Sequence, residues 1–172
     1  MNVPKIALGT VQFGIDYGVN SVHGQVRPEE VKKILSYANL KGVGLLDVAP
    51  AYGNSEKILG RMNVSNFKVV TKTRHFDSLE INNNDVKLLN NDFHHSLKDL
   101  KQYSVYGVLI HDADDLLKPG AEKLFDKLQE LKQAEKIVKI GVSVYNHSQL
   151  QPILDNFDID LFQLPFNILD RR

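Results

Sequence analysis

Short apolar segments alternate with longer amphipathic segments along the whole chain. The apolar segments cover residues 5–9, 44–48, 67–72, 105–111, 138–144 and 159–166, and several of them are rich in β-branched residues. Continuous apolar runs of this length are typical of strands that are buried on both faces of a sheet. Each segment therefore predicts one strand of a parallel sheet.

Between the predicted strands, apolar residues recur with the spacing of a helix. In residues 27–42, Val31, Ile34, Leu35 and Ala38 share one helical face. Similar patterns predict helices over 55–62, 85–103, 119–136 and 147–157. We expect Ser55 to cap the helix that it begins, and Pro152 to delay or distort the last helix.

The alternation of strand and helix predicts parallel strands joined by crossover helices, and two architectures fit it. An open doubly wound sheet suits the strand count and the 172 residues, whereas a (β/α)8 barrel has eight strands and about 250 residues. A dinucleotide-binding open sheet would have a G-x-G-x-x-G turn after the first strand. The sequence lacks that turn, and no helix is expected directly after the first strand, which weakens the open-sheet interpretation. We expect one domain over residues 1–172.

Composition excludes several classes of function. Lys plus Arg equals Asp plus Glu at 21 each, so no basic excess points to nucleic acid or to an acidic membrane surface. The chain has no cysteine, which excludes disulfides and thiolate metal sites. It also shows neither an apolar run of about 20 residues nor a secretory signal, so we expect a cytoplasmic protein.

Four reactive side chains follow consecutive predicted strands. Asp47 ends the second strand and Tyr52 lies in the loop after it, while Lys72 ends the third strand and His111 the fourth. Each alone has an ordinary structural explanation, such as a cap, a half-buried aromatic or a hydrogen-bonded core histidine. Because the carboxyl ends of parallel strands open on one face, the four together predict a functional site.

These four residue types suit the protonation of a carbonyl oxygen. A tyrosine has an ordinary pKa of about 10, and a nearby ammonium stabilises the phenolate and lowers that pKa. A carboxylate can hold the ammonium in place, and a neutral histidine can orient the carbonyl. The carbon would then accept a hydride, which only a bound cofactor can supply. No H-x-x-x-H, HExxH, G-x-S-x-G or Walker pattern is present, so no metal is predicted and a metal-dependent barrel hydrolase is disfavoured.

At these residues the sequence resembles the aldo/keto reductase superfamily, and the resemblance covers the whole chain. It is carried by "LGTVQFG" (8–14), "LDVAPAYGNSEKILG" (46–60), "VVTK", "LIHDADDLL", "IGVSVYN" and "LFQLPFNILDRR". The resemblance implies a TIM-type (β/α)8 barrel that reduces an aldehyde, ketone or sugar carbonyl with NADPH. It also implies that Tyr52 is the general acid, that Lys72, paired with Asp47, lowers its pKa, and that His111 positions the carbonyl.

The same resemblance implies the cofactor contacts. Thr10, Val11, Asp47, Ser143 and Gln163 match positions that contact the nicotinamide end of NADPH. Many members have an asparagine after the serine, whereas this chain has Val144, which has no amide group to make that contact.

The family barrel has two further βα units, which carry most contacts to the adenosine and phosphate groups. The resemblance therefore implies an incomplete barrel of about six parallel strands, with weak or absent NADPH binding. Unpaired edge strands invite pairing with another chain, so we expect a homo-oligomer or a rearranged, partly open sheet. The resemblance implies that the substrate is a small-molecule carbonyl compound. Two alternatives stay open: a catalytically inert truncated barrel or self-assembling module with a vestigial site, or a piece of a longer enzyme.

Overall fold

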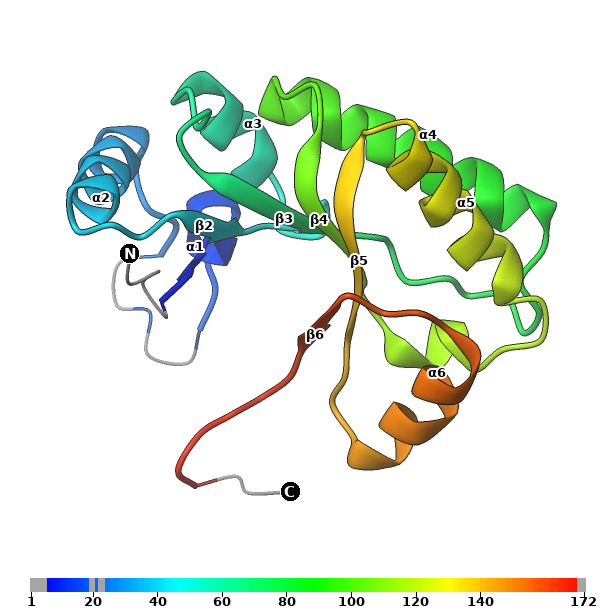
Figure 1. The fold of residues 1–172 in the computed structure, drawn as a ribbon. Coiled ribbons are helices and arrows are strands. Elements are labelled where there is room, and N and C mark those ends of the chain that lie inside the picture. Colours follow the sequence, from blue (N-terminus) through cyan, green and yellow to red (C-terminus); the bar gives the residue numbers. More distant parts are fainter. Residues whose placement is uncertain (1–5, 19–20, 22–23, 170–172) are drawn as a thin grey trace. The chain divides into compact units, whose positions relative to one another are not determined.

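The computed structural model describes residues 6–18, 21 and 24–169 (Figure 1). Along this described part of the chain, six strands alternate with helices. The strands are β1 (Leu8–Gly9), β2 (Leu45–Asp47), β3 (Lys68–Lys72), β4 (Val105–Ile110), β5 (Ile137–Ser143) and β6 (Leu161–Gln163). The α-helices are α1 (Val11–Gly14), α2 (Pro28–Leu40), α3 (Ser55–Arg61), α4 (Asn83–Leu100), α5 (Glu122–Gln133) and α6 (Leu150–Asn156), with 3₁₀ turns at Ala113–Leu116 and His147–Gln149.

The order of the strands distinguishes the two predicted architectures. The strands form one six-stranded sheet in the order β1-β2-β3-β4-β5-β6, and the pairs with a described register are parallel. A doubly wound sheet reverses its strand order at the point where its ligand binds, whereas a (β/α) barrel adds each strand beside the last. The sequential order therefore confirms the predicted fold class, an incomplete (β/α) barrel.

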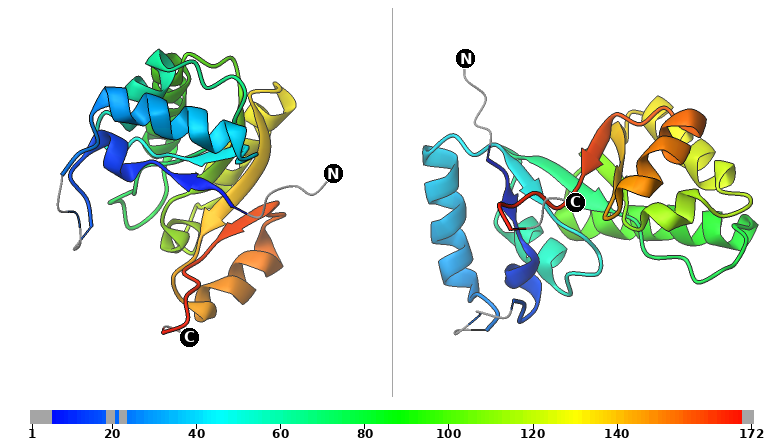
Figure 2. Two further views of the ribbon diagram at one scale, coloured as in Figure 1. Left: turned by 90° about the vertical axis from the view of Figure 1, so that its left-hand side faces the viewer. Right: turned by 90° about the horizontal axis from the view of Figure 1, so that it is seen from below.

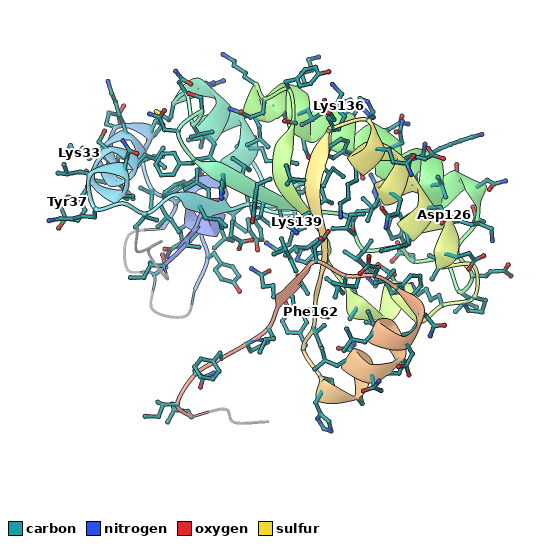
Figure 3. All side chains as sticks on the ribbon, viewed as in Figure 1. Lys33, Tyr37, Asp126, Lys136, Lys139 and Phe162 are labelled. Carbon is teal, nitrogen blue, oxygen red and sulfur yellow. The ribbon has the colours of Figure 1, made fainter. Side chains whose placement is uncertain are left out.

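The chain divides into two compact units, one made of Met1–Thr71 and His94–Val105 and the other of Lys72–Phe93 and Tyr106–Arg172. In the first unit, β1 pairs with β2 through Leu8 and Leu46, and β2 pairs with β3 through Leu46 and Val69. Leu46 has apolar neighbours on both strands and is fully buried. Helix α2 turns Val31 inward, while Lys33 and Tyr37 point outward (Figure 3).

In the second unit, β5 and β6 lie side by side, with Gly141 opposite Leu161 and Ser143 opposite Gln163 (Figure 2). A Cβ atom added at Gly141 would lie 2.5 Å from the carbonyl oxygen of Leu161, so only glycine fits this pairing. Helix α5 packs against β5 (Figure 1), and its residues Leu124 and Leu128 are fully buried. This packing gives the unit an apolar core behind the strand that ends at Ser143.

The predicted elements are all present, but their ends differ. Most strands are shorter than the apolar runs that predicted them, whereas β5 has the predicted length and begins one residue earlier. The first helix was not predicted: α1 begins at Val11, directly after β1. Ser55 is not the cap of α3 but its first residue, and Asn54 occupies the cap position. Pro152 does lie in the first turn of α6, after a 3₁₀ turn, as the sequence predicted.

Within the part of the chain that the structure describes, no helix combines the length and the apolar character that a membrane crossing requires. The predicted single domain and the predicted homo-oligomer stay predictions.

Candidate active site

Two of the predicted catalytic residues, Asp47 and Tyr52, belong to the turn that follows β2. Asp47 is the last residue of the strand, and Val48 and Ala49 after it are fully buried. The amide of Tyr52 donates to the carbonyl of Ala49 at 3.0 Å, which closes a tight turn. Gly53 then adopts a φ of +59°, a conformation that glycine accepts without strain, and leads the chain into α3.

Helix α1 supports this turn from one side. A Cβ atom added at Gly14 would lie 1.7 Å from the carbonyl oxygen of Tyr52 and 2.5 Å from the amide nitrogen of Ser55. One added at Gly53 would lie 2.8 Å from the carbonyl oxygen of Gly14. The two segments therefore touch backbone to backbone. The turn that carries Tyr52 is fixed because neither glycine leaves space for movement.

The buried hydroxyl groups of Thr10 and Ser55 also stabilise this turn. Ser55 Oγ lies 2.9 Å from the carbonyl oxygen of Thr10 and 3.0 Å from its hydroxyl. The hydroxyl of Thr10 donates to the carbonyl oxygen of Asp47 at 2.8 Å, and the amide of Thr10 donates to the same oxygen at 3.0 Å. Sequence reasoning missed this role for Ser55, because a contact 45 residues away leaves no local signal.

Thr10 was predicted to contact the cofactor, and in the structure it belongs to a buried group of hydrogen-bonded residues. The residue is 0% exposed, and its hydroxyl is engaged with Asp47 and Ser55. The side chain of Thr10 therefore holds the end of β2 in place. Val11, the other residue predicted beside it, is partly exposed at the start of α1. The cofactor role of both residues stays a prediction.

The phenol of Tyr52 is held in its protonated form. Burial, then the negative charge of Asp47, and then Tyr17 raise its pKa to about 12. This direction is the reverse of the one that the sequence predicted, because burial and a carboxylate both disfavour the phenolate. The effect of Lys72 on Tyr52 stays a prediction. At neutral pH the group is a proton donor, and it has almost no phenolate form.

The other two predicted catalytic residues lie at the ends of β3 and β4. Lys72 ends β3 and is only 4% exposed, and His111 directly follows β4. The intervening Thr73 joins the two strand ends, because its amide donates to the carbonyl of Leu109 at 2.9 Å and its hydroxyl accepts from the amide of His111 at 3.2 Å. The backbones that carry Lys72 and His111 are thus fixed in register.

Ser143 and Gln163 end β5 and β6, and their side chains meet. The hydroxyl of Ser143 donates to Oε1 of Gln163 at 3.2 Å. The amide of Val144 donates to the carbonyl of Gln163 at 2.8 Å, and the side chain of Val144 is buried. A hydroxyl beside a primary carboxamide offers both donors and acceptors, which a second carboxamide can use. Among the residues that the structure describes, no group of three or more His, Asp or Glu side chains could hold a metal ion.

The family model for the aldo/keto reductase family matches residues 5–172. The chain belongs to the aldo/keto reductase family. No curated protein sequence matches this aldo/keto reductase.

Solved aldo-keto reductases share the fold. A protein from Pseudomonas aeruginosa assigned to the aldo-keto reductases is 26% identical, with a TM-score of 0.79 over 96% of this chain and 64% of its own. The glycerol dehydrogenase of Gluconobacter oxydans is 24% identical, with a TM-score of 0.72 over 99% of this chain and 56% of its own. An aldo-keto reductase from Bombyx mori, solved in complex with NADP, is 22% identical, with a TM-score of 0.70 over 95% of this chain and 55% of its own. The chain thus spans less than two thirds of the length of these relatives.

Proposed function

We propose that this chain carries the carbonyl-reducing site of an NADPH-dependent aldo/keto reductase. The observation that carries the proposal is the family match over residues 5–172, which includes Asp47, Tyr52, Lys72 and His111. The substrate class is an aldehyde, a ketone or a sugar in its open-chain carbonyl form. Such a substrate needs one proton at its oxygen and one hydride at its carbon.

Tyr52 is the proton donor in this proposal. Its pKa of about 12 keeps the phenol protonated at neutral pH, so the proton is present when the carbonyl binds. The ammonium of Lys72 would stabilise the phenolate that forms when the proton leaves, and Asp47 would hold the ammonium in place. A neutral His111 would donate a hydrogen bond to the carbonyl oxygen and orient it toward the phenol.

The side chains at the ends of β5 and β6 fit the nicotinamide end of NADPH. Ser143 and Gln163 together present a hydroxyl and a carboxamide, and these complement the carboxamide of nicotinamide. When bound, the cofactor supplies the hydride. The relative solved in complex with NADP supports this choice of cofactor.

A titration with NADPH, followed by fluorescence, tests the proposal when it is combined with turnover of a panel of aldehydes, ketones and sugars. We expect saturable binding, and we expect Tyr52→Phe to lower turnover about 10²- to 10⁴-fold while binding stays the same, because only the proton donor is removed. Tyr37→Phe is the matched control, since Tyr37 is 62% exposed on the outer side of α2.

Two results would count against the proposal in different ways. Absence of NADPH binding at high micromolar concentration would rule out an active NADPH-dependent enzyme for these 172 residues and would support the inert module. Binding together with full turnover in Tyr52→Phe would instead refute the assignment of the proton donor.

A further inference from the structure

The loop after β4 contains a buried carboxylate that the proposed chemistry does not use. Asp115 lies in the 3₁₀ turn Ala113–Leu116, four residues beyond His111, and its side chain is 0% exposed. Its Oδ1 atom lies 2.7 Å from the ammonium of Lys118. Its Oδ2 atom accepts from the amide of Phe76 at 3.3 Å and lies 3.8 Å from Nδ1 of His75. Burial raises the pKa of this carboxyl, and Lys118 opposes that shift.

This ion pair clamps one residue of the neighbouring loop. Lys118 also donates to the carbonyl oxygen of Phe76, so the pair binds both main-chain polar groups of Phe76. The ring of Phe76 is buried as well. His75 Nδ1 lies 3.0 Å from a carboxylate oxygen of Asp112, which adds a polar contact between the same two loops.

Further contacts extend the junction along both loops. The amide of Ile81 donates to the carbonyl of Pro119 at 2.8 Å, and the ammonium of Lys123 donates to the carbonyl of Ile81 at 3.1 Å. Gly120 has a φ of +78°, and a Cβ atom there would lie 2.4 Å from the carbonyl oxygen of Ile81. The loop after β3 is therefore joined to the loop after β4 from Thr73 to Ile81.

The first of the two joined loops directly follows Lys72, and the second begins at His111. An apolar pair of similar size could replace a buried ion pair without loss of stability. It could not, however, bind both the amide and the carbonyl of Phe76. The charged pair therefore contributes a defined geometry in addition to any stability.

We propose that Asp115, with Lys118, is a positioning residue that holds Lys72 and His111 in their working arrangement. The inference rests on the proposed function, because it assigns Asp115 a role in carbonyl reduction. Unlike the proposed function, the role of Asp115 can be tested by a measurement that needs no enzyme turnover. The environment of the His111 ring should depend on the charge of Asp115, which lies in the loop after β4.

The test is Asp115→Asn in the full chain, with Asp77→Asn as the matched control. Asp77 belongs to the loop after β3 but is 101% exposed, so its replacement makes the same chemical change without breaking the clamp. The readout is the Cε1–H resonance of His111 in a histidine-labelled sample, assigned from its loss in His111→Gln. We expect Asp115→Asn to move this resonance by more than its linewidth and Asp77→Asn to leave it unchanged.

A second variant keeps the test decisive if Asp115→Asn does not fold. Lys118→Gln removes the same ion pair from a side chain that is 20% exposed, and it should move the His111 resonance in the same direction. An unchanged resonance in either folded variant would overturn the proposal. If the wild type turns over a carbonyl, kcat should fall about 10- to 100-fold in Asp115→Asn while KM for NADPH stays the same. If the wild type shows no turnover, the proposed function fails and the resonance still decides the role of Asp115.

Discussion

Replacement of Asp160 should lower the stability of the chain without disturbing the candidate active site. Asp160 lies in the segment before β6, where its carboxylate accepts from Lys132 at 2.6 Å, from Lys139 at 2.9 Å and from the amide of Ile140 at 2.9 Å. Lys139 is on β5 (Figure 3) and Lys132 is on α5. One carboxylate thus joins the segment before β6 to a helix and to the neighbouring strand.

The lowered pKa of Asp160 gives the size of the expected loss of stability. Burial raises the pKa of this carboxyl, but the hydrogen bonds from Lys132, Ile140 and Lys139 outweigh it and lower the pKa from 3.8 to about 2. At 1.36 kcal/mol per pKa unit, the difference corresponds to about 2 kcal/mol. The side chains of Lys132 and Lys139 are 33% and 38% exposed, so water screens part of this energy, and we expect about 1–2 kcal/mol.

The sign of the pH dependence follows from the lowered pKa. The stabilisation is complete above the ordinary pKa of 3.8 and is lost as the pH falls from there toward about 2. Between these values the unfolded chain binds the proton more readily than the folded chain does. The free energy of unfolding should therefore decrease with acid in the wild type and decrease less in Asp160→Asn.

Urea unfolding followed by far-UV circular dichroism at pH 7 and at pH 3 tests this reasoning. Asp158→Asn is the matched control, because Asp158 is exposed two residues away and should change stability by less than about 0.5 kcal/mol. The reasoning is refuted if Asp160→Asn is as stable at pH 7 as the control, or if its loss of stability is equally large at both pH values.

Three further predictions concern the turn that carries Tyr52. Gly14→Ala should lower the free energy of unfolding by about 2 kcal/mol or more, because its methyl group would lie 1.7 Å from the carbonyl oxygen of Tyr52. Gly44→Ala is the control, because a methyl group there would have nothing within 4 Å. Thermal melts of both variants check this, and equal melting temperatures would contradict it. Ser55→Ala should cost about 1–2 kcal/mol in urea unfolding, since it leaves the buried polar groups of Thr10 without the Ser55 hydroxyl. On the proposed mechanism, alcohol oxidation requires the phenolate of Tyr52, so its rate should rise about tenfold per pH unit toward the pKa of about 12. The rate of carbonyl reduction should stay constant from pH 6 to 9. Initial rates in both directions test this, and an oxidation rate that does not change with pH would exclude Tyr52 as the group that titrates.

Local pattern was enough to predict most elements of the fold, because strands buried on both faces have short continuous apolar runs and helices follow a period of 3.6 residues. The stripe of Val31, Leu35 and Ala38 predicted α2, and these residues are buried. The pattern could not locate α1, which has only four residues and no periodicity of its own. It also could not distinguish an open sheet from a barrel, because strand order is a property of pairing and not of any one segment.

The contacts that fix the candidate site were beyond sequence reasoning for a related reason. Ser55 was interpreted as a helix cap, because that is what a serine before a helical pattern usually is. Its actual partner is Thr10, and the partner of Asp115 in the neighbouring loop is Phe76, 39 residues away. Such contacts depend on which loops the fold places together. The sequence supplied the residue types at the strand ends, and the structure supplied the groups that hold them.

Tyr52 illustrates what this difference means for chemistry. From residue types alone, a lysine suggested a lowered pKa for the phenol, but in the structure burial and Asp47 raise the pKa to about 12. At neutral pH the protonated form then exceeds the phenolate by about 10⁵. On the proposed mechanism, the ammonium of Lys72 therefore does not serve to ionise Tyr52 before the substrate binds. Lys72 would instead stabilise the negative charge that appears on Tyr52 only as the proton moves to the carbonyl oxygen. An interaction that is made only at that stage lowers the barrier of the step and does not stabilise the ground state.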